Sequence, residues 1–364
     1  MALSTGIIGL PTVGKTTLFN LLTKSQAQTS NFFSGKASTN FKLAPIPDER
    51  IDYLTDLYNP KKTTYAQIEV TDVPGLVKGA SQGEGIGNEF LNSVRKVSAL
   101  VHVVRAFENP EVLHVDGSID VMRDVETINM ELLFADLAMV ETRIDRILNN
   151  KKKKKESAEE LRLLEKCRSV LEEEKMLNQL ELDDEEWQQL KHLEFLTLKP
   201  MILVVNVDEV QLEGGNYPGK DELKNYAKEN GIPLLEICAR AEVEIGELDE
   251  EDRAMFMEEL GIDEPGIDRL AKVIYDYLGL ISFLTAGPDE VRAWTIRKGS
   301  TAKEAGGKIH SDIERGFIRA EVVSFNDLKE CGSMSKAKEM GLVRLEGKDY
   351  IVQDGDIIQF RFNV

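Results

Sequence analysis

The spacing of apolar side chains divides the chain into segments with three different periodicities. In the first part, short and nearly continuous apolar runs alternate with helical stretches, and these runs cover residues 4–9, 99–104, 201–205 and 233–237. A further segment, 66–72, alternates apolar and polar side chains. Strands that helices bury on both faces have sequences of this kind. We therefore predict an α/β domain with a parallel sheet.

Between residues 104 and 201 the apolar spacing becomes helical. Steps of four and three residues connect Leu133, Leu137, Val140, Ile144 and Ile147. This spacing is typical of the seam of a coiled-coil helix. A second helical run carries Leu161, Leu164, Cys167 and Leu171, and a basic stretch from Lys151 to Lys155 separates the two runs. The pattern predicts an inserted helical hairpin whose lysine tip is either a solvated turn or a contact for phosphate groups.

From residue 282 onward, short alternating segments at 292–296, 318–322 and 357–362 are separated by turns that contain glycine or proline. Such segments indicate the strands of a small β-rich domain. The predicted domains are a sheet domain from residues 1–122 and 197–281, the helical insertion at 123–196, and a C-terminal domain at 282–364.

Composition adds expectations about partners and compartment. The formal net charge of −19 argues against general binding to nucleic-acid backbones. Residues 282–364 contain 13 basic and 13 acidic side chains, so the acidic excess lies upstream and leaves room for a local nucleic-acid contact. No apolar run is long enough for a membrane span, and the N-terminus does not have the pattern of a signal peptide. Cys167, Cys238 and Cys331 have no paired spacing, so we expect reduced thiols in a cytoplasmic protein without membrane contact.

The first apolar run leads into a glycine loop with the spacing Gly-x-x-x-x-Gly-Lys-Thr and then into a helical stretch. The glycines allow backbone N–H groups to surround phosphates, and the helix N-terminus adds a partial positive charge. In such a loop Lys15 reaches the β- and γ-phosphates of a nucleotide, and the Thr16 hydroxyl ligates Mg²⁺. The predicted phosphate-binding residues are Gly9, Leu10, Pro11, Thr12, Val13, Gly14, Lys15, Thr16 and Thr17.

Asp72 ends the segment 66–72 and is followed by Val73, Pro74 and Gly75. Downstream of a glycine loop, an aspartate in this place holds Mg²⁺, usually through water, and the glycine N–H senses the γ-phosphate. We predict these roles for Asp72 and Gly75. The glycine-rich stretch 78–87 is predicted to change conformation with the bound nucleotide.

Ras-like enzymes place a glutamine after this glycine to orient the attacking water. Here the position is Leu76, which cannot form that hydrogen bond. Either hydrolysis is very slow, or another group positions the water. His114, in the loop after the 99–104 run, is the candidate because imidazole accepts a proton near neutral pH. A structural loop histidine is the alternative, and His102, within the buried run, is predicted to be a core residue.

The base-reading segment departs from the guanine-specific pattern Asn-Lys-x-Asp. The chain has Asn206, Val207, Asp208 and Glu209 after the 201–205 run, so the lysine is absent and the last carboxylate is one methylene longer. Adenine has no N2 amine for a carboxylate, whereas an amide such as that of Asn206 pairs with adenine N7 and N6. We therefore predict that ATP is preferred over GTP. The predicted base-binding residues are Asn206, Val207, Glu209, Cys238 and Ala239.

With these motifs the chain resembles the YchF subfamily of Obg-related P-loop NTPases along nearly its whole length. The segments that carry the resemblance are 9–17, 72–81, 114–118 and 206–209, and segments 293–300 and 347–356 resemble a ubiquitin-like TGS domain. The resemblance implies a nucleotide-binding core, a coiled-coil insertion and a β-grasp TGS domain. It also implies ATP preferred over GTP, Mg²⁺ as cofactor and association with ribosomes, and His114 stands where the family has its proposed catalytic histidine.

Two positions depart from the family pattern. The first-switch threonine expected to reach Mg²⁺ aligns with Lys36, and Thr39 is the candidate substitute. Thr12 stands where an asparagine is common, and the sequence leaves dependence on a monovalent ion open.

The leading hypothesis is a Mg²⁺-dependent ATPase that acts as a conformational switch on a ribosomal partner, with RNA contacts through the 151–155 tip and the TGS domain. Two alternatives stay open. One is a nucleotide-gated adaptor with negligible hydrolysis, which Leu76 favours. The other is a GTPase acting on RNA, which conflicts with Val207 and the acidic charge.

Overall fold

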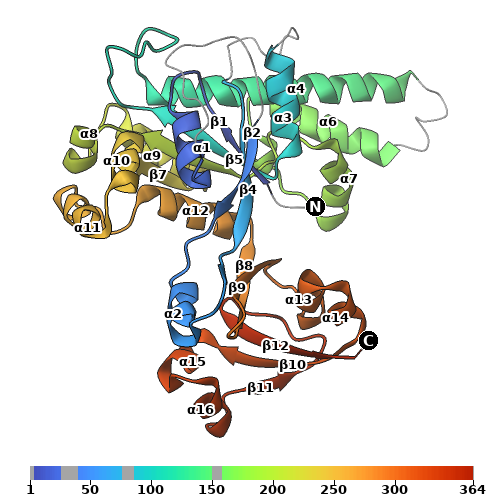
Figure 1. The fold of residues 1–364 in the computed structure, drawn as a ribbon. Coiled ribbons are helices and arrows are strands. Elements are labelled where there is room, and N and C mark those ends of the chain that lie inside the picture. The colour runs from blue at the N-terminus through green and yellow to red at the C-terminus, as the bar shows by residue number, and fades with distance from the viewer. Residues whose placement is uncertain (1–3, 26–39, 76–85, 150–157, 364) are drawn as a thin grey trace. The chain divides into compact units, whose positions relative to one another are not determined.

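The computed structural model describes residues 4–25, 40–75, 86–149 and 158–363 (Figure 1). The chain forms two compact units, and each unit is built from two separate stretches of sequence. Unit 1 comprises Met1–Leu43 and Glu69–Leu270, and unit 2 comprises Ala44–Ile68 and Ala271–Val364. The predicted boundaries of the helical insertion and of the C-terminal domain stay predictions.

The sheet of unit 1 has six strands in the order β2-β4-β1-β5-β6-β7. The pairs β1–β4, β1–β5, β5–β6 and β6–β7 are parallel, which confirms the predicted parallel sheet. Strands β1, β5 and β6 are buried along their whole length, as expected for continuous apolar runs. The strands are β1 (Ser4–Ile8), β2 (Asn40–Pro45), β4 (Gln67–Asp72), β5 (Ala99–Arg105), β6 (Met201–Asn206) and β7 (Leu234–Ile237).

Helices connect these strands, so that the carboxyl ends of the parallel strands meet at one edge of the sheet. Helix α1 (Lys15–Thr23) follows β1, and α10 (Ala239–Glu247), which follows β7, packs beside it. The other helices that begin in unit 1 are α3 (Ile86–Lys96), α4 (Val121–Leu148), α6 (Ala158–Glu172), α7 (Asp184–Leu190), α8 (Glu209–Gly214), α9 (Lys220–Glu229), α11 (Glu250–Glu259) and α12 (Gly266–Tyr277). Short 3-10 turns lie at Leu177–Gln179 and Lys191–Leu193.

Helices α4 and α6 form the predicted helical hairpin (Figure 1). One apolar cluster joins α4 to α6, and its buried members on these helices are Leu133, Val140, Ile144, Ile147, Leu163, Leu164, Cys167 and Leu171. The periodicity of the sequence therefore identified the buried face of both helices. The tip from Lys151 to Lys155 lies outside the described residues.

The sheet of unit 2 also has six strands, in the order β11-β10-β12-β8-β9-β3, and it is mixed. The three segments predicted as strands lie in β9, β10 and β12. The strands are β3 (Thr63–Thr64), β8 (Leu280–Ala286), β9 (Val291–Arg297), β10 (Phe317–Ser324), β11 (Arg344–Glu346) and β12 (Asp356–Phe362). The helices are α2 (Glu49–Tyr58), α13 (Ala302–Ile309), α14 (Ser311–Arg315), α15 (Phe325–Cys331) and α16 (Met334–Glu339).

The elements α2 and β3 come from residues 44–68, which the sequence analysis assigned to the first domain. Helix α2 packs on β8 and β9, and β3 pairs in parallel with β9. The pairing of distant stretches produces no local periodicity, so the sequence did not reveal it.

Two composition-based expectations concern membrane spans and cysteine pairing. Among the helices that the structure describes, none is both long and apolar enough to cross a membrane. All three cysteines are free and buried, which confirms that they are not paired.

Candidate nucleotide-binding site

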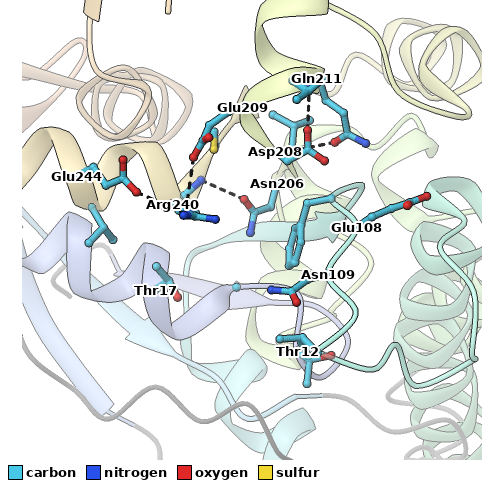
Figure 2. Close-up of a pocket in the computed structure, with 18 of the residues that line it drawn as sticks. Thr12, Thr17, Glu108, Asn109, Asn206, Asp208, Glu209, Gln211, Arg240 and Glu244 are labelled. Atoms are coloured by element: carbon cyan, nitrogen blue, oxygen red, sulfur yellow. Dashed lines mark hydrogen bonds and ion pairs between the residues drawn. The ribbon is translucent and has the colours of Figure 1, made fainter. Parts of the chain in front are cut away.

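A cavity of about 740 Å³ lies in unit 1 where the loops after β1, β5, β6 and β7 meet (Figure 2). Ligands of open parallel α/β sheets bind at this edge. The predicted site residues that line the cavity are Thr12, Gly14, Lys15, Thr16, Thr17, Asn206, Val207, Glu209, Cys238 and Ala239. Loop residues Gly9, Leu10, Pro11 and Val13 belong to the same turn but do not line it, and neither do Asp72, Gly75 or His114.

The backbone of the glycine loop requires glycine at two positions. Gly14 has φ +101°, and a Cβ built on it would lie 2.4 Å from the amide nitrogen of Asn206. A side chain at Gly9 (φ +148°) would meet the Val103 carbonyl at 2.4 Å. Both positions therefore exclude any other residue, and α1 begins directly after Gly14.

Lys15 is buried at the first position of α1, and its ammonium donates to the Leu10 carbonyl at 2.6 Å. Burial lowers the pKa of Lys15 to about 8, although the charge of Asp72 raises it. A Cβ built on Gly75 would lie 3.2 Å from the Lys15 nitrogen. The structure thus brings Lys15 and Gly75 together, as their predicted contact with one γ-phosphate requires.

Thr16 and Asp72 also lie together, since the Thr16 hydroxyl donates to the Asp72 carboxylate at 2.9 Å. Burial raises the pKa of Asp72, while the hydrogen bond from Thr16 and the charge of Lys15 lower it. A buried carboxylate whose pKa stays raised has incomplete compensation for its charge.

Asn206 connects two of the loops around the cavity. Its amide nitrogen donates to the Val13 carbonyl at 3.0 Å, and its amide oxygen accepts from the Ala239 N–H at 3.1 Å. From the sequence, this amide is expected to read the base. In the structure it also braces the glycine loop against the start of α10, which leaves one amide hydrogen and one lone pair for a base.

Glu209 faces Arg240 across the base side of the cavity. Their closest N–O distance is 3.7 Å, and Arg240 also lies 3.4 Å from Glu244, so Figure 2 shows the guanidinium between two carboxylates. The Arg240 side chain is 81% exposed. The pairing of Arg240 with Glu209 was not predicted from the sequence.

The loop after β5 contributes cavity residues that the sequence analysis missed, among them Phe107 and Asn109. Arg105, at the end of β5, is 2% exposed and donates to the carbonyls of both residues, at 3.1 Å and 3.4 Å. Its guanidinium also lies over the Phe107 ring, 4.3 Å from the centroid. The available signal was the position of these residues directly after a buried strand.

His114 lies in the loop between β5 and α4, as predicted, but its ring is turned toward α4. Its Nε2 is 2.8 Å from an oxygen of Asp124, and the His114 side chain is 3% exposed. The neighbouring Leu113 carbonyl accepts a hydrogen bond from the Thr12 hydroxyl at 3.2 Å, so this loop contacts the glycine loop. Thr12 has φ +62°, an uncommon conformation for a β-branched residue.

The structure tests the prediction for His102, whereas several other predictions fall on residues that it does not describe. His102 is buried, which confirms the predicted core residue, and burial lowers its pKa to about 3. Lys36, Thr39, Leu76 and most of the stretch 78–87 lie outside the described residues.

Comparison with known proteins identifies relatives over the whole chain. Residues 4–133 match a family described as "50S ribosome-binding GTPase", and residues 280–363 match a YchF-GTPase C-terminal family described as "Protein of unknown function (DUF933)". Proteins named "Ribosome-binding ATPase YchF" from Bacillus subtilis and Escherichia coli O157:H7 are 48% and 46% identical over 367 residues, which cover 100% of both chains. The solved structure of the Schizosaccharomyces pombe YchF GTPase is 33% identical, with a TM-score of 0.86, and the match covers 99% of this chain and 97% of that one.

Proposed function

Because the chain belongs to the YchF family of P-loop nucleotide hydrolases, we propose that it prefers ATP over GTP and switches conformation on ribosomes in the cytoplasm. One observation carries this proposal. In the cavity of unit 1, the glycine loop meets the segment 206–209, which lacks the lysine and the aspartate of the guanine-reading pattern. The names of the full-length relatives support the same function.

We assign the predicted Mg²⁺ to Thr16 and Asp72. Their oxygens, 2.9 Å apart, are hard ligands of the kind that Mg²⁺ prefers. The raised pKa of Asp72 fits a carboxylate whose charge a cation would compensate. When bound, the ion neutralises charge on the β- and γ-phosphate oxygens. Lys15 would hold the same phosphates with its ammonium group.

The base preference rests on three side chains. Val207 is buried and offers no ammonium group, and Glu209, which lines the cavity, faces the Arg240 guanidinium. The Arg240 guanidinium competes with the N1–H and N2 amine of guanine for this carboxylate. Asn206 keeps one amide hydrogen and one lone pair for N7 and N6 of adenine.

Calorimetry with ATP and GTP in the presence of Mg²⁺ tests this preference. ATP is expected to bind more tightly, and tighter binding of GTP to the unmodified protein would overturn the assignment. A double variant, Val207→Lys with Glu209→Asp, rebuilds the guanine-reading pattern and is expected to move the selectivity toward GTP.

Ribosome association is supported by the description of the N-terminal family and by the names of the relatives. We propose that the lysines at 151–155 contribute to it through phosphate contacts, together with the C-terminal TGS-like domain. Replacing the five lysines with glutamines is expected to weaken ribosome co-sedimentation and to flatten its dependence on salt. Arginines at the same positions keep the charge and serve as the control. An unchanged salt profile with glutamines would indicate a solvated turn.

A second candidate function, a nucleotide-gated adaptor with negligible hydrolysis, is favoured by the orientation of His114. The proposed water-positioning ring faces Asp124 and does not line the cavity. If His114→Ala leaves ATP turnover unchanged while ribosome binding still follows the nucleotide, the adaptor is supported. A large loss of turnover would support His114 as the base.

A further inference from the structure

The His114 ring uses both of its nitrogens in the described conformation. Nδ1 accepts a hydrogen bond from the Asp116 backbone N–H at 3.1 Å, and Nε2 lies 2.8 Å from Asp124 Oδ2. A nitrogen that accepts from an N–H carries no proton, so the proton is on Nε2 and is donated to the carboxylate. The single lone pair of the neutral ring is therefore already in use, and the ring cannot accept a proton from water.

Asp124 is itself held firmly in the first turn of α4. The Arg123 guanidinium donates to Asp124 Oδ1 at 2.9 Å and 3.1 Å. The same guanidinium donates to the hydroxyl and the carbonyl of Ser118, at 2.9 Å and 2.6 Å. Arg123 thus fastens the far end of the His114 loop to the carboxylate that binds the ring.

A metal ion is not needed to explain this cluster. His114, Asp116 and Asp124 offer ligand atoms within 4.8 Å of one another. However, Arg123 lies 2.9 Å from Asp124 and 3.8 Å from Asp116, so a cationic side chain already occupies the place between the carboxylates.

The loop is nevertheless next to the phosphate site. Leu113 precedes the histidine, is 81% exposed, and accepts the hydrogen bond of Thr12 from the glycine loop. A local opening of the loop would therefore release the ring beside the nucleotide, whereas the closed loop keeps it against α4.

From these contacts we propose that Asp124 is a positioning residue that holds His114 in a parked, inactive conformation. The inference rests on the proposed hydrolysis at this site and on His114 as its base. When the loop opens, the hydrogen bond between His114 and Asp124 breaks and the ring gains access to the nucleotide. The basal turnover is then set by the fraction of molecules in which the loop is open.

The first test measures ATP turnover without ribosomes in four proteins: the unmodified chain, Asp124→Asn, His114→Ala and the double variant. Asparagine keeps the shape of the acceptor but removes its charge. We expect Asp124→Asn to raise turnover roughly fivefold, the difference between a charged and a neutral hydrogen bond. In the double variant with His114→Ala, we expect this rise in ATP turnover to be absent. Asp120→Asn, which removes a carboxylate from the same helix end but still caps α4, is expected to change little.

The second test does not need hydrolysis. Diethyl pyrocarbonate labels accessible imidazoles, and mass spectrometry reports each histidine separately. In the unmodified protein His114 is expected to react much more slowly than His310, whose side chain is 64% exposed. Asp124→Asn is expected to raise the His114 rate several-fold while the His310 rate stays constant.

The outcomes separate the inference from the function. Fast labelling of His114 in the unmodified protein, or a folded Asp124→Asn variant with unchanged or reduced turnover, would overturn the parked conformation. Absence of ATP turnover in all four proteins would overturn the proposed function, while slow labelling that Asp124→Asn relieves would still support the parked ring.

Discussion

Three ionisable side chains around the cavity have partners that compensate their charge only in part. Lys15 donates to a carbonyl, Asp72 accepts from a hydroxyl, and Glu209 faces an exposed guanidinium 3.7 Å away. Each of these charges is free to gain from a ligand of opposite sign. At the scale of single residues, the site is therefore organised for phosphates and a cation.

The lowered pKa of Lys15 predicts proton uptake when a nucleotide binds. The unfolded chain keeps the Lys15 proton up to the ordinary pKa of a lysine. Between pH 8 and that ordinary pKa, Lys15 therefore increases the free energy of unfolding of the nucleotide-free protein as the pH rises. Bound phosphates favour the charged ammonium group and raise the pKa of Lys15 again. At pH 8.5 we expect binding to take up roughly three quarters of a proton, against roughly a tenth at pH 7. Calorimetry in buffers of different ionisation enthalpy measures this difference, and equal uptake at both values would contradict it.

Arg240 is predicted to influence the choice of base. Arg240→Gln removes the partner of Glu209 and frees its carboxylate for guanine. Because the arginine is exposed, the selectivity for ATP over GTP should fall by only about two- to fivefold. Glu244→Gln removes the other partner of Arg240 and should leave the selectivity unchanged. Adding Glu209→Gln to Arg240→Gln should remove this loss of selectivity for ATP over GTP. If the loss persists in the double variant, Glu209 is not the group that accepts from guanine.

At the scale of secondary structure, periodicity predicted the hairpin because α4 and α6 bury regular apolar stripes. It could not predict the polar contact that anchors α4. Asp136 is fully buried and accepts from both the N–H and the hydroxyl of Thr197, each at 2.8 Å, and Arg95 of α3 lies 3.6 Å away. These partners are distant in sequence, and an aspartate in a helical stretch normally indicates the solvent face.

Asp136→Ala is predicted to destabilise unit 1 by about 3 kcal/mol, because it leaves the buried N–H of Thr197 without an acceptor. Urea unfolding followed by circular dichroism measures this loss. Thr197→Val removes only the hydroxyl contact and is expected to cost about 1 kcal/mol. Equal losses for both variants would show that the backbone contact contributes little.

At the scale of the whole molecule, the sequence predicted the parallel sheet, the glycine loop and the strands of the C-terminal region. Each of these depends on a local pattern. The assignment of residues 44–68 to unit 2 depends on contacts between distant stretches, which no local pattern records. The same applies to the cavity, where the Asn206 amide donates to the Val13 carbonyl and accepts from the Ala239 N–H.

Arg50 is predicted to link α2 to the C-terminal part of unit 2. Its guanidinium binds Asp48 at 2.8 Å and Asp354 at 2.7 Å; burial lowers its pKa, but these carboxylates raise it above the usual value. Since Asp354 is half exposed, Arg50→Met should cost only about 1 kcal/mol. Lys61→Met breaks a fully exposed pair with Asp289 and is the control.

The measurement uses the two tryptophans of the chain. In a Trp187→Phe background, the fluorescence of Trp294 in β9 reports urea unfolding of unit 2. A lower midpoint for Arg50→Met than for Lys61→Met is expected. Equal midpoints would show that apolar packing alone holds α2.

The split origin of unit 2 also sets an order of events during synthesis. Residues 44–68 leave the ribosome roughly 200 residues before the strands on which α2 packs, although domains generally fold as they emerge. Ile51 and Leu54 of α2 are fully buried in the finished protein, but they cannot be buried until those strands have been synthesised. A chain interrupted before residue 271 would display this apolar helix face, and chaperones or proteases would recognise it as unfinished.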